Sequence, residues 1–247
     1  QWVTSMGHFQ GLFDNDWLGI PATGKMAYLR YAEFHNVRNG KIVRSSFFCD
    51  IIGVMHQAGI NPLPIQTGAS GIVPGPKTHD GIQIASQPES ESQKTMAMLN
   101  QMIADLDELN HSGDDRYPPE VLERSWHSDM SWYGPAGIGS TYTIRRYQEQ
   151  HSYPFREALK DKVYNGHICR YADGDYACFF GWPNLTHTPT GGFLGLPGND
   201  CRVDMRVVDV YRREGDKLAE NWVIIDLPWW LKQQGIDILE RCKNIIS

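Results

Sequence analysis

Asp226 is the residue of this chain whose position in the sequence best suits it to acid/base chemistry. It joins an apolar, strand-like segment (217–225) to an amphipathic, helix-like segment (227–236), and its nearest neighbours are apolar. Apolar surroundings raise the pKa of a carboxyl group because they disfavour its charged form. A carboxylate poised near neutrality can remove a proton alpha to a carbonyl group and return it to the new alkoxide. The alternative is an N-cap role, in which the helix dipole would lower the pKa instead.

A second candidate group occupies residues 126–135, Trp-His-Ser-Asp-Met-Ser-Trp-Tyr-Gly-Pro. His127 and Asp129 lie two positions apart, so on a strand they face the same side. There they could assist proton transfer or hydrogen-bond to a substrate oxygen, with Trp132 and Tyr133 beside them. The alternative is a pair of satisfied polar residues at the end of a helix.

The other candidates are polar or aromatic residues in apolar contexts. His151 ends a predicted helix, where it either complements the helix dipole or faces a cavity. His187 precedes a Leu-Gly-Leu-Pro segment, and a loop over a cavity mouth would place it near a ligand. Arg206 lies inside an apolar strand and must therefore pair with a carboxylate. Trp222 is first of all a core residue, and second a surface for a flat polycyclic ligand.

The elements that would carry these residues occur twice. Residues 41–60 match residues 217–236 at a constant offset of 176 positions, which is the separation of Asp50 from Asp226. The match continues upstream without a gap, so the chain contains an internal duplication. Three candidate residues of the second copy therefore have counterparts in the first, namely Asp50 for Asp226, Arg30 for Arg206, and His8 in the loop region that corresponds to that of His187. The same offset aligns Glu33 with Asp209.

The duplication predicts two units of unequal length. Residues 1–63 form a β-rich half unit that starts in the middle of its own pattern, so its front half is either absent from the protein or lies outside this sequence. Residues 64–94 are rich in Pro, Gly, Ser and Thr and predict a linker. Residues 95–247 predict a complete unit.

Local signals predict the elements of both units. The half unit has two strand-like segments joined by Asn39-Gly40, a strong hairpin signal, and then a helix from Asp50 to Gly59. In the complete unit, helical segments (99–109, 118–124, 142–151, 154–160) precede strand-like ones (164–171, 175–182, 202–211, 218–226). Helices followed by a curved antiparallel sheet make an α+β fold with the helices on the concave face.

Three segments, in their order along the chain, resemble the SnoaL-like polyketide cyclases, also called predicted ester cyclases, of the nuclear-transport-factor-2-like (cystatin-like) superfamily. They are Trp-His-x-Asp-x-x-Trp-Tyr-Gly-Pro, a Gly-x-Pro before a long strand, and a strand-Asp-helix ending with Gln-x-Gly. The resemblance covers residues 95–240 as a whole unit and 1–63 as the back half of another. It implies a cone-shaped cavity that performs a cofactor-free intramolecular aldol condensation, with an aspartate on the last strand as acid/base. By position that aspartate is Asp226, with Asp50 as its counterpart.

Composition narrows the classes of partner. A net charge of −6 and a pI near 5.8 argue against a nucleic-acid surface, and no run approaches the ~18 apolar residues of a membrane span. Five widely spaced cysteines are typical of reduced residues in a cytoplasmic protein. The histidines lack metal-site spacing and the glycines lack nucleotide-binding patterns, so such a catalyst would use no metal and no cofactor.

Three functions follow from these observations. The first is a cyclase or related lyase acting on a small hydrophobic or aromatic carbonyl compound, with Asp226 as base and His127 or Asp129 assisting. The second is a hydratase or epoxide-hydrolase type of enzyme that uses Asp129, Arg206 and Asp226 to activate water. The third is a binding or dimerisation module without catalysis, because fold does not fix function.

The half unit also predicts an interface. Its strands should expose an apolar face, which is unusual in a globular protein. We expect these strands either to stack on the sheet of the complete unit or to join an equivalent half from another chain in a homodimer.

Overall fold

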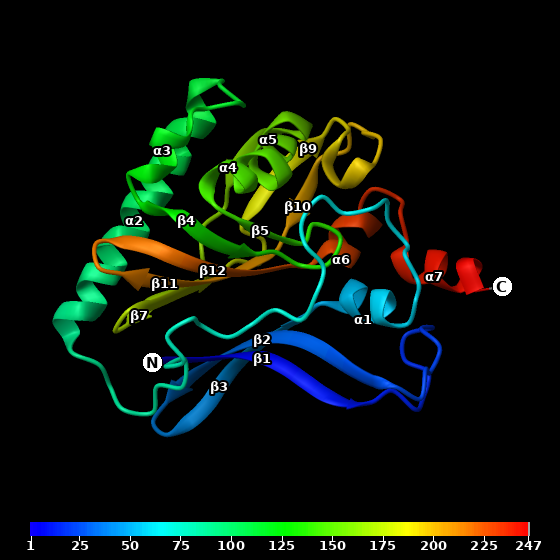
Figure 1. Cartoon of the computed structure of the whole chain (residues 1–247), viewed down its shortest axis with the longest axis horizontal. Helices are drawn as coiled ribbons and strands as arrows, with labels where there is room; N and C mark the ends of the chain where they lie inside the picture. Colours follow the sequence, from blue (N-terminus) through cyan, green and yellow to red (C-terminus); the bar gives the residue numbers. More distant parts are fainter. Residues whose placement is uncertain (247) are drawn as a thin grey trace.

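Two β-sheets stacked face to face form the centre of the computed structural model, which describes residues 1–246 (Figure 1). The lower sheet, with the helix that follows it, is called the first unit. Its antiparallel strands have the order β1-β2-β3, with β1 at Trp2–Leu12, β2 at Met26–Arg38 and β3 at Lys41–Cys49, and α1 (Ile51–Gln57) follows. The predicted hairpin turn is confirmed, since Asn39 and Gly40 have φ values of 49° and 70°, the left-handed conformation that such a turn requires.

The second unit is built on a six-stranded sheet with the order β5-β4-β12-β11-β8-β7 and a smaller sheet with the order β10-β9-β6. Neighbouring strands are antiparallel except for β12 and β4, which run parallel. The strands are β4 (Trp126–Tyr133), β5 (Ser140–Tyr142), β6 (Leu159–Tyr164), β7 (Cys169–Asp173), β8 (Tyr176–Phe180), β9 (Leu185–Pro189), β10 (Val203–Met205), β11 (Val207–Glu214) and β12 (Lys217–Ile225).

Helices cover the face of the six-stranded sheet that points away from the first unit (Figure 1). They are α2 (Glu89–Ser112), α3 (Pro119–Glu123), α4 (Ile144–Tyr147), η1 (Gln148–Ser152), α5 (Tyr153–Ala158) and η2 (Phe193–Gly195), with α6 (Leu227–Lys232) and α7 (Ile238–Ile246) after the last strand. No helix within residues 1–246 combines the length and the apolar character needed to cross a membrane. The arrangement is the cone-shaped α+β fold that the sequence predicts.

The internal duplication is visible in one repeated backbone clamp. The Gln57 side chain accepts a hydrogen bond from the Tyr28 N–H and donates one to the Tyr28 carbonyl, each at 2.8 Å. Gln233 makes the same pair of bonds with Asp204, at 2.9 Å each. The glutamine thus ties α1 to the start of β2 in the first copy and the end of α6 to β10 in the second, because its amide can donate and accept at once.

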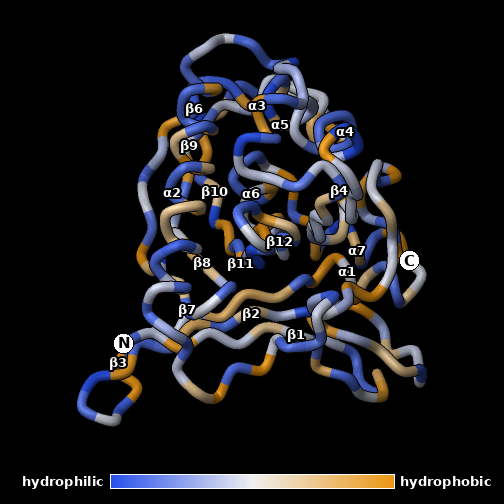
Figure 2. The backbone as a smooth tube through the Cα atoms, turned by 60° about the vertical axis from the view of Figure 1, so that its left-hand side comes forward, coloured by the Kyte–Doolittle hydropathy of each residue, from blue (hydrophilic) through white to orange (hydrophobic). Residues whose placement is uncertain are grey.

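The two sheets meet through an apolar layer, as predicted for the half unit. Phe34 is fully buried and its ring centroid lies 4.6 Å from that of Phe180 on the opposite sheet. Burying a phenylalanine contributes roughly 1.5–3 kcal/mol, so a few such contacts hold the layers together. Figure 2 shows apolar stretches in both layers where they meet. The layer comprises Ala32, Phe34 and Phe48 of the first unit and Cys169, Cys178, Phe180, Val208 and Ile224 of the second.

The predicted linker runs between the units and is anchored at several points. Ala69 exchanges two backbone hydrogen bonds with Ser140 of β5, at 2.7 and 2.9 Å. Further along, the Pro74 carbonyl accepts a bond of 2.9 Å from the Trp222 indole. The segment then enters α2 at Glu89, so the helix starts inside the stretch that composition marks as linker.

Some predicted elements differ from those observed. The strand predicted over 164–171 is two strands, β6 and β7, because the chain is irregular over residues 165–168, where Gly166 has φ 92°. Strand β9 has no predicted counterpart, since three of its five residues, Thr186 to Thr188, are polar in a row and its last residue is Pro189. The helix predicted over 142–151 begins at Ile144, and its second half is the π-helix η1.

Candidate functional site

A cavity of about 490 Å³ opens between the concave face of the second unit's sheet and the helices above it. Its floor is formed by residues of β8, β11 and β12, which point toward the helices. Its walls come from α2, η1, α5 and β6. The apolar lining includes Met102, Leu122, Trp126, Phe155, Phe179, Met205, Val207, Val223 and Ile225.

Asp209 is the buried carboxylate of this cavity, whereas Asp107, which also lines it, is exposed. Asp209 lies in the middle of β11 and is 9% exposed. Its Oδ1 accepts hydrogen bonds from the Tyr211 hydroxyl at 3.0 Å and from the Asn221 amide at 3.2 Å. Burial raises the pKa of Asp209 to about 7, although the bonds from Asn221 and Tyr211 act in the opposite direction. A carboxyl group with this pKa can both take and return a proton near neutral pH.

One wall of the cavity is flat and aromatic. His151 stacks on Trp132, with ring centroids 4.1 Å apart and an interplanar angle of 18°. Tyr147 lies beside this pair, with its ring centroid 5.6 Å from that of Trp132. Burial lowers the pKa of His151 to about 3, so the imidazole is neutral and acts as a planar surface.

Tyr147 offers a hydrogen-bond donor to the cavity. Its hydroxyl makes no hydrogen bond within residues 1–246, while the residue lines the cavity. Burial raises its pKa well above the ordinary value for tyrosine, and the neighbouring Tyr117 and the charge of Asp209 raise it further. The phenol therefore stays protonated, and Asp209 lines the same cavity.

Two basic side chains lie where the helices and β6 close the cavity. Arg156 is buried and donates to the carbonyls of Leu109 and Asp114 at 2.6 and 3.0 Å. Lys162 donates to the carbonyls of Arg156, at 3.4 Å, and of Leu159. Burial, with the nearby charge of Arg156, lowers the pKa of Lys162 to about 8. Both groups give this end of the cavity a positive potential.

The cavity contains only some of the residues that sequence reasoning singled out. Trp132 and His151 line it, and Asp226 does not. Asp226 instead caps α6, accepting a bond of 3.3 Å from the Trp229 N–H, and pairs with Arg206 at 3.2 Å. Arg206 in turn is stacked between two indoles, 4.0 Å from the Trp182 centroid and 3.5 Å from that of Trp229. Asp226 is therefore the N-cap of α6, which is the alternative role that the sequence left open.

The pair His127 and Asp129 also lies outside the cavity lining. The His127 Nε2 atom is 2.9 Å from the Glu214 carbonyl, and Asp129 is exposed. The parallel ladder between β4 and β12 is irregular between Leu218 and Glu220, which interrupts the simple alternation of faces that the prediction used. The two residues thus form no site with Asp226.

Three further predicted residues are structural. Tyr133 stacks on Trp222, with centroids 5.5 Å apart, on the side of the sheet that faces the linker. His187 is fully buried and its Nε2 accepts a bond of 2.8 Å from the Trp230 indole. Burial lowers the pKa of His187 to about 4, which keeps it neutral and able to accept. None of the three is among the residues that line the cavity.

The three first-unit counterparts come together in a second pocket. His8, Arg30 and Asp50 line a hollow of about 420 Å³ that is bounded by α1, the linker and the loop between β4 and β5. His8 and Arg30 face each other across the β1–β2 ladder. Of the predicted residues, two thus line the large cavity of the second unit and three line this smaller pocket, while the others line neither.

Sequence reasoning did not select Asp209, although the sequence carries a signal for it. An acidic residue in the middle of the apolar run Val207-Val-Asp-Val-Tyr211 is unusual, since a buried carboxylate is costly unless hydrogen-bonded. The duplication aligns it with Glu33, whose Oε2 lies 3.4 Å from the His35 Nε2. An acid thus occupies this position in both copies.

The positions of the His, Cys, Asp and Glu side chains bear on metal binding and thiol chemistry. Within residues 1–246, no three His, Cys, Asp or Glu side chains are grouped so that they could hold a metal ion. The five cysteines are all free.

Comparison with known proteins identifies the family to which this protein belongs. The model of the SnoaL-like polyketide cyclase family matches residues 1–58 and 168–234, together just over half of the chain. The protein belongs to this family. The two matched segments lie in the two units that the duplication defines.

Solved structures show similar folds at low identity. A SnoaL-like protein from Jannaschia sp. CCS1 is 14% identical, with a TM-score of 0.46, and the alignment covers 58% of this chain and 92% of that one. An NTF2-like protein from Burkholderia xenovorans LB400 is 11% identical, with a TM-score of 0.44 and coverage of 58% and 97%. TsrD from Streptomyces laurentii is 20% identical, with a TM-score of 0.45 and coverage of 56% and 96%. No curated protein matches the chain.

Proposed function

We propose that this protein is a cofactor-independent, polyketide-cyclase-like enzyme that acts on an enolisable carbonyl compound in the large cavity, with Asp209 as its acid/base. Membership of the SnoaL-like polyketide cyclase family supports a cyclase type of activity. The observation that carries the assignment to Asp209 is its place in the cavity, where burial raises its pKa to about 7. Asp226, the residue expected from position in the sequence, is not among the residues that line that cavity.

The chemistry is an intramolecular aldol addition. The Asp209 carboxylate removes a proton from a carbon alpha to one carbonyl, which leaves an enolate. The enolate carbon attacks a second carbonyl carbon of the same molecule, so that a C–C bond forms and the C=O π bond opens to an alkoxide. The alkoxide takes the proton back from Asp209, and every atom and charge is restored.

Other cavity residues support this step. The Tyr147 hydroxyl is a protonated donor that can hydrogen-bond to the oxygen on which negative charge develops. Arg156 and Lys162 supply positive potential at one end and favour substrates with carbonyl or carboxylate oxygens there. The stacked pair of Trp132 and His151 provides a flat surface for an aromatic substrate.

The two alternatives are less well supported. A hydratase or epoxide hydrolase built on Asp129, Arg206 and Asp226 would need these residues around one cavity, but none of them lines it. A module without a ligand site is expected to have a collapsed interior, whereas the cavity measures about 490 Å³. A binding protein without turnover differs from the enzyme only in whether Asp209 exchanges protons with the ligand.

Proton exchange on a simple aromatic ketone tests the proposal. We would incubate the protein with 1-tetralone in D₂O and follow deuterium incorporation beside the carbonyl by proton NMR. The wild-type protein should accelerate exchange, and Asp209→Asn should lose ~10²–10⁴-fold of that acceleration, the usual contribution of a general base. Full exchange activity in a folded Asp209→Asn variant would remove Asp209 from the mechanism. Binding of 1-tetralone without exchange in the wild type would favour the non-catalytic module.

A further inference from the structure

The pocket of the first unit differs from the matching place in the second unit by one large side chain. The offset of the duplication pairs Arg30 with Arg206 and Gly53 with Trp229. In the second unit the Trp229 indole lies over the Arg206 guanidinium, with its centroid 3.5 Å from the guanidinium carbon. In the first unit the residue at that position has no side chain, and the pocket of about 420 Å³ is lined by both Gly53 and Arg30.

Arg30 is held in position without an aromatic partner. It is 5% exposed, and its two terminal nitrogens donate to the carbonyls of Tyr133 and Gly134, each at 2.9 Å. Its Nε atom is buried and has no hydrogen-bond partner, as is also true of Arg206. For Arg206 the indole faces cover that atom, whereas within residues 1–246 no aromatic ring is stacked on Arg30. Arg30 thus forms a fixed and mostly buried part of the pocket wall, and a guanidinium plane is a surface on which planar rings stack.

We propose that this pocket is a second binding site, for a small planar aromatic ligand that stacks on Arg30 in the place that the Trp229 indole takes over Arg206. The proposal is independent of the chemistry assigned to Asp209, because the two cavities share no lining residue.

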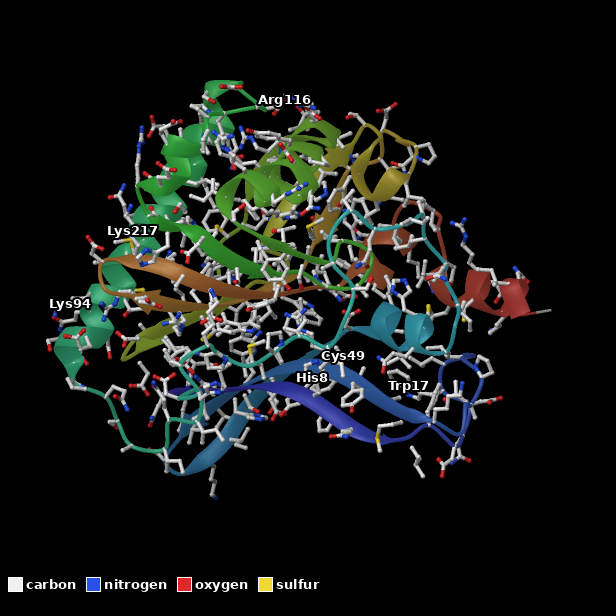
Figure 3. All side chains as sticks on the ribbon, in the orientation of Figure 1. His8, Trp17, Cys49, Lys94, Arg116 and Lys217 are labelled. Atoms are coloured by element: carbon white, nitrogen blue, oxygen red, sulfur yellow. The ribbon has the colours of Figure 1, made fainter. Side chains whose placement is uncertain are left out.

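The rim of the pocket supplies polar contacts for such a ligand. His8 and His56 line it, and neither ring makes a hydrogen bond within the described part of the chain. Burial lowers the pKa of both histidines, so each neutral ring offers one donor and one acceptor. Figure 3 shows His8 on the first-unit sheet, beside the linker.

Asp50 and the linker complete the enclosure. The Asp50 carboxylate is occupied, since it accepts from the Gly53 N–H at 3.0 Å and from the Ala136 N–H at 2.7 Å. The linker contributes Gln66, Ser70 and Ile72 to the lining. With the charge of Asp50 balancing that of Arg30, the site suits a neutral ring with one polar substituent.

Indole is the probe that the comparison of the two units suggests. We would titrate indole into ¹⁵N-labelled protein and follow amide shifts by NMR. Saturable shifts are expected at Gly53, Ser70 and Gly71. Gly53→Trp places an indole where the second unit has one, and it should weaken binding at these amides at least tenfold. The added Cβ would lie 3.3 Å from the Asp50 Cγ, which requires a shift of only a few tenths of an ångström.

Matched variants distinguish indole binding in the first-unit pocket from indole binding elsewhere on the protein. Gly11→Trp adds the same side chain where a Cβ meets no atom within 4 Å, and it should leave indole binding unchanged. Trp229→Gly removes the indole over Arg206, so added indole should produce a second set of shifts around Arg206. That result would show that indole can stack on a guanidinium at this position. Shifts confined to cavity amides such as Asn221 and Val223, or shifts that persist in a folded Gly53→Trp, would overturn the proposal. If Gly53→Trp does not fold, Arg30→Lys replaces it, and unchanged affinity there would overturn the proposal equally.

Discussion

Tyr211 donates a hydrogen bond of 3.0 Å to Asp209 from two positions further along the same strand. Residues two apart on a strand share a face, so β11 itself places the acid and its donor together in the cavity. Asn221 of the neighbouring strand adds a second donor to the same oxygen, at 3.2 Å. The carboxylate is thus oriented by two donors, yet burial still raises its pKa to about 7.

Stability should depend on pH through Asp209. Its pKa is about 7 in the folded protein and about 3.9 in an unfolded chain, so between these values the folded state binds the extra proton. Stability therefore falls as pH rises from about 4 to about 7, by at most about 4 kcal/mol, and is level above that range. Urea unfolding of the wild type and Asp209→Asn at pH 4.5 and 8 measures this contribution.

Comparison with Asp209→Asn also controls for the other groups whose protonation changes the free energy of unfolding. His151 and His187 have lowered pKa values, so they cost stability as pH falls below about 6.5, the opposite sense to Asp209. The difference between wild type and Asp209→Asn cancels their effect. A difference that does not change with pH would contradict the raised pKa.

Asp226→Asn should retain the exchange activity toward 1-tetralone within about twofold. Asparagine caps a helix about as well as aspartate, and a partly exposed ion pair such as that with Arg206 contributes only about 0–1 kcal/mol. Urea unfolding and the exchange assay would be run side by side, with Asp226→Ala as the variant that also loses the cap. A loss of activity as large as that in Asp209→Asn would return Asp226 to the mechanism.

Tyr147→Phe should lower the exchange rate constant ~10²-fold, because the enolate would lose a donor that the cavity provides. Tyr153→Phe is the matched control, since the Tyr153 hydroxyl bonds to the Tyr117 carbonyl and does not line the cavity. That control should cost about 1 kcal/mol of stability and leave the rate unchanged. Equal rates in the two variants would exclude Tyr147 as the donor.

Phe34→Ala should destabilise the protein by about 3–5 kcal/mol, since it leaves a cavity between the two sheets opposite Phe180. Phe47→Ala, on the outer face of the same sheet, should cost about 1 kcal/mol or less because Phe47 is 48% exposed. Urea unfolding measures both. Limited proteolysis should also cut the first unit faster in Phe34→Ala than in Phe47→Ala, and similar behaviour of the two variants would argue against the interface.

The fold was largely predictable because its signals are local or repeated. Apolar strand patterns, the Asn39-Gly40 turn and the aspartate caps of α1 and α6 depend on neighbouring residues, and the duplication shows each pattern twice. Short elements such as β9 were not predictable, because their strand conformation comes from pairing with β6 and β10.

The site was harder to predict than the fold. Asp226 and Asp209 both stand in apolar sequence, and sequence alone does not show which one points into the cavity. The alternation along β11 puts Asp209 on the concave face, while Asp226 turns into the first turn of α6 and is held there by Trp229 and Arg206. The basic residues Arg156 and Lys162 reach the cavity only because α5 and β6 fold over it.

The most direct measurement is the titration of Asp209 itself, because it requires no substrate. Protein labelled with ¹³C at aspartate side-chain carboxyls would be titrated from about pH 3 to about pH 9 and observed by NMR, with Asp209 assigned by the signal missing from Asp209→Asn. We expect a midpoint near pH 7, set by burial in the cavity. A midpoint in the ordinary aspartate range, below about 5, would show that the carboxylate is well solvated and would contradict its role as the acid/base.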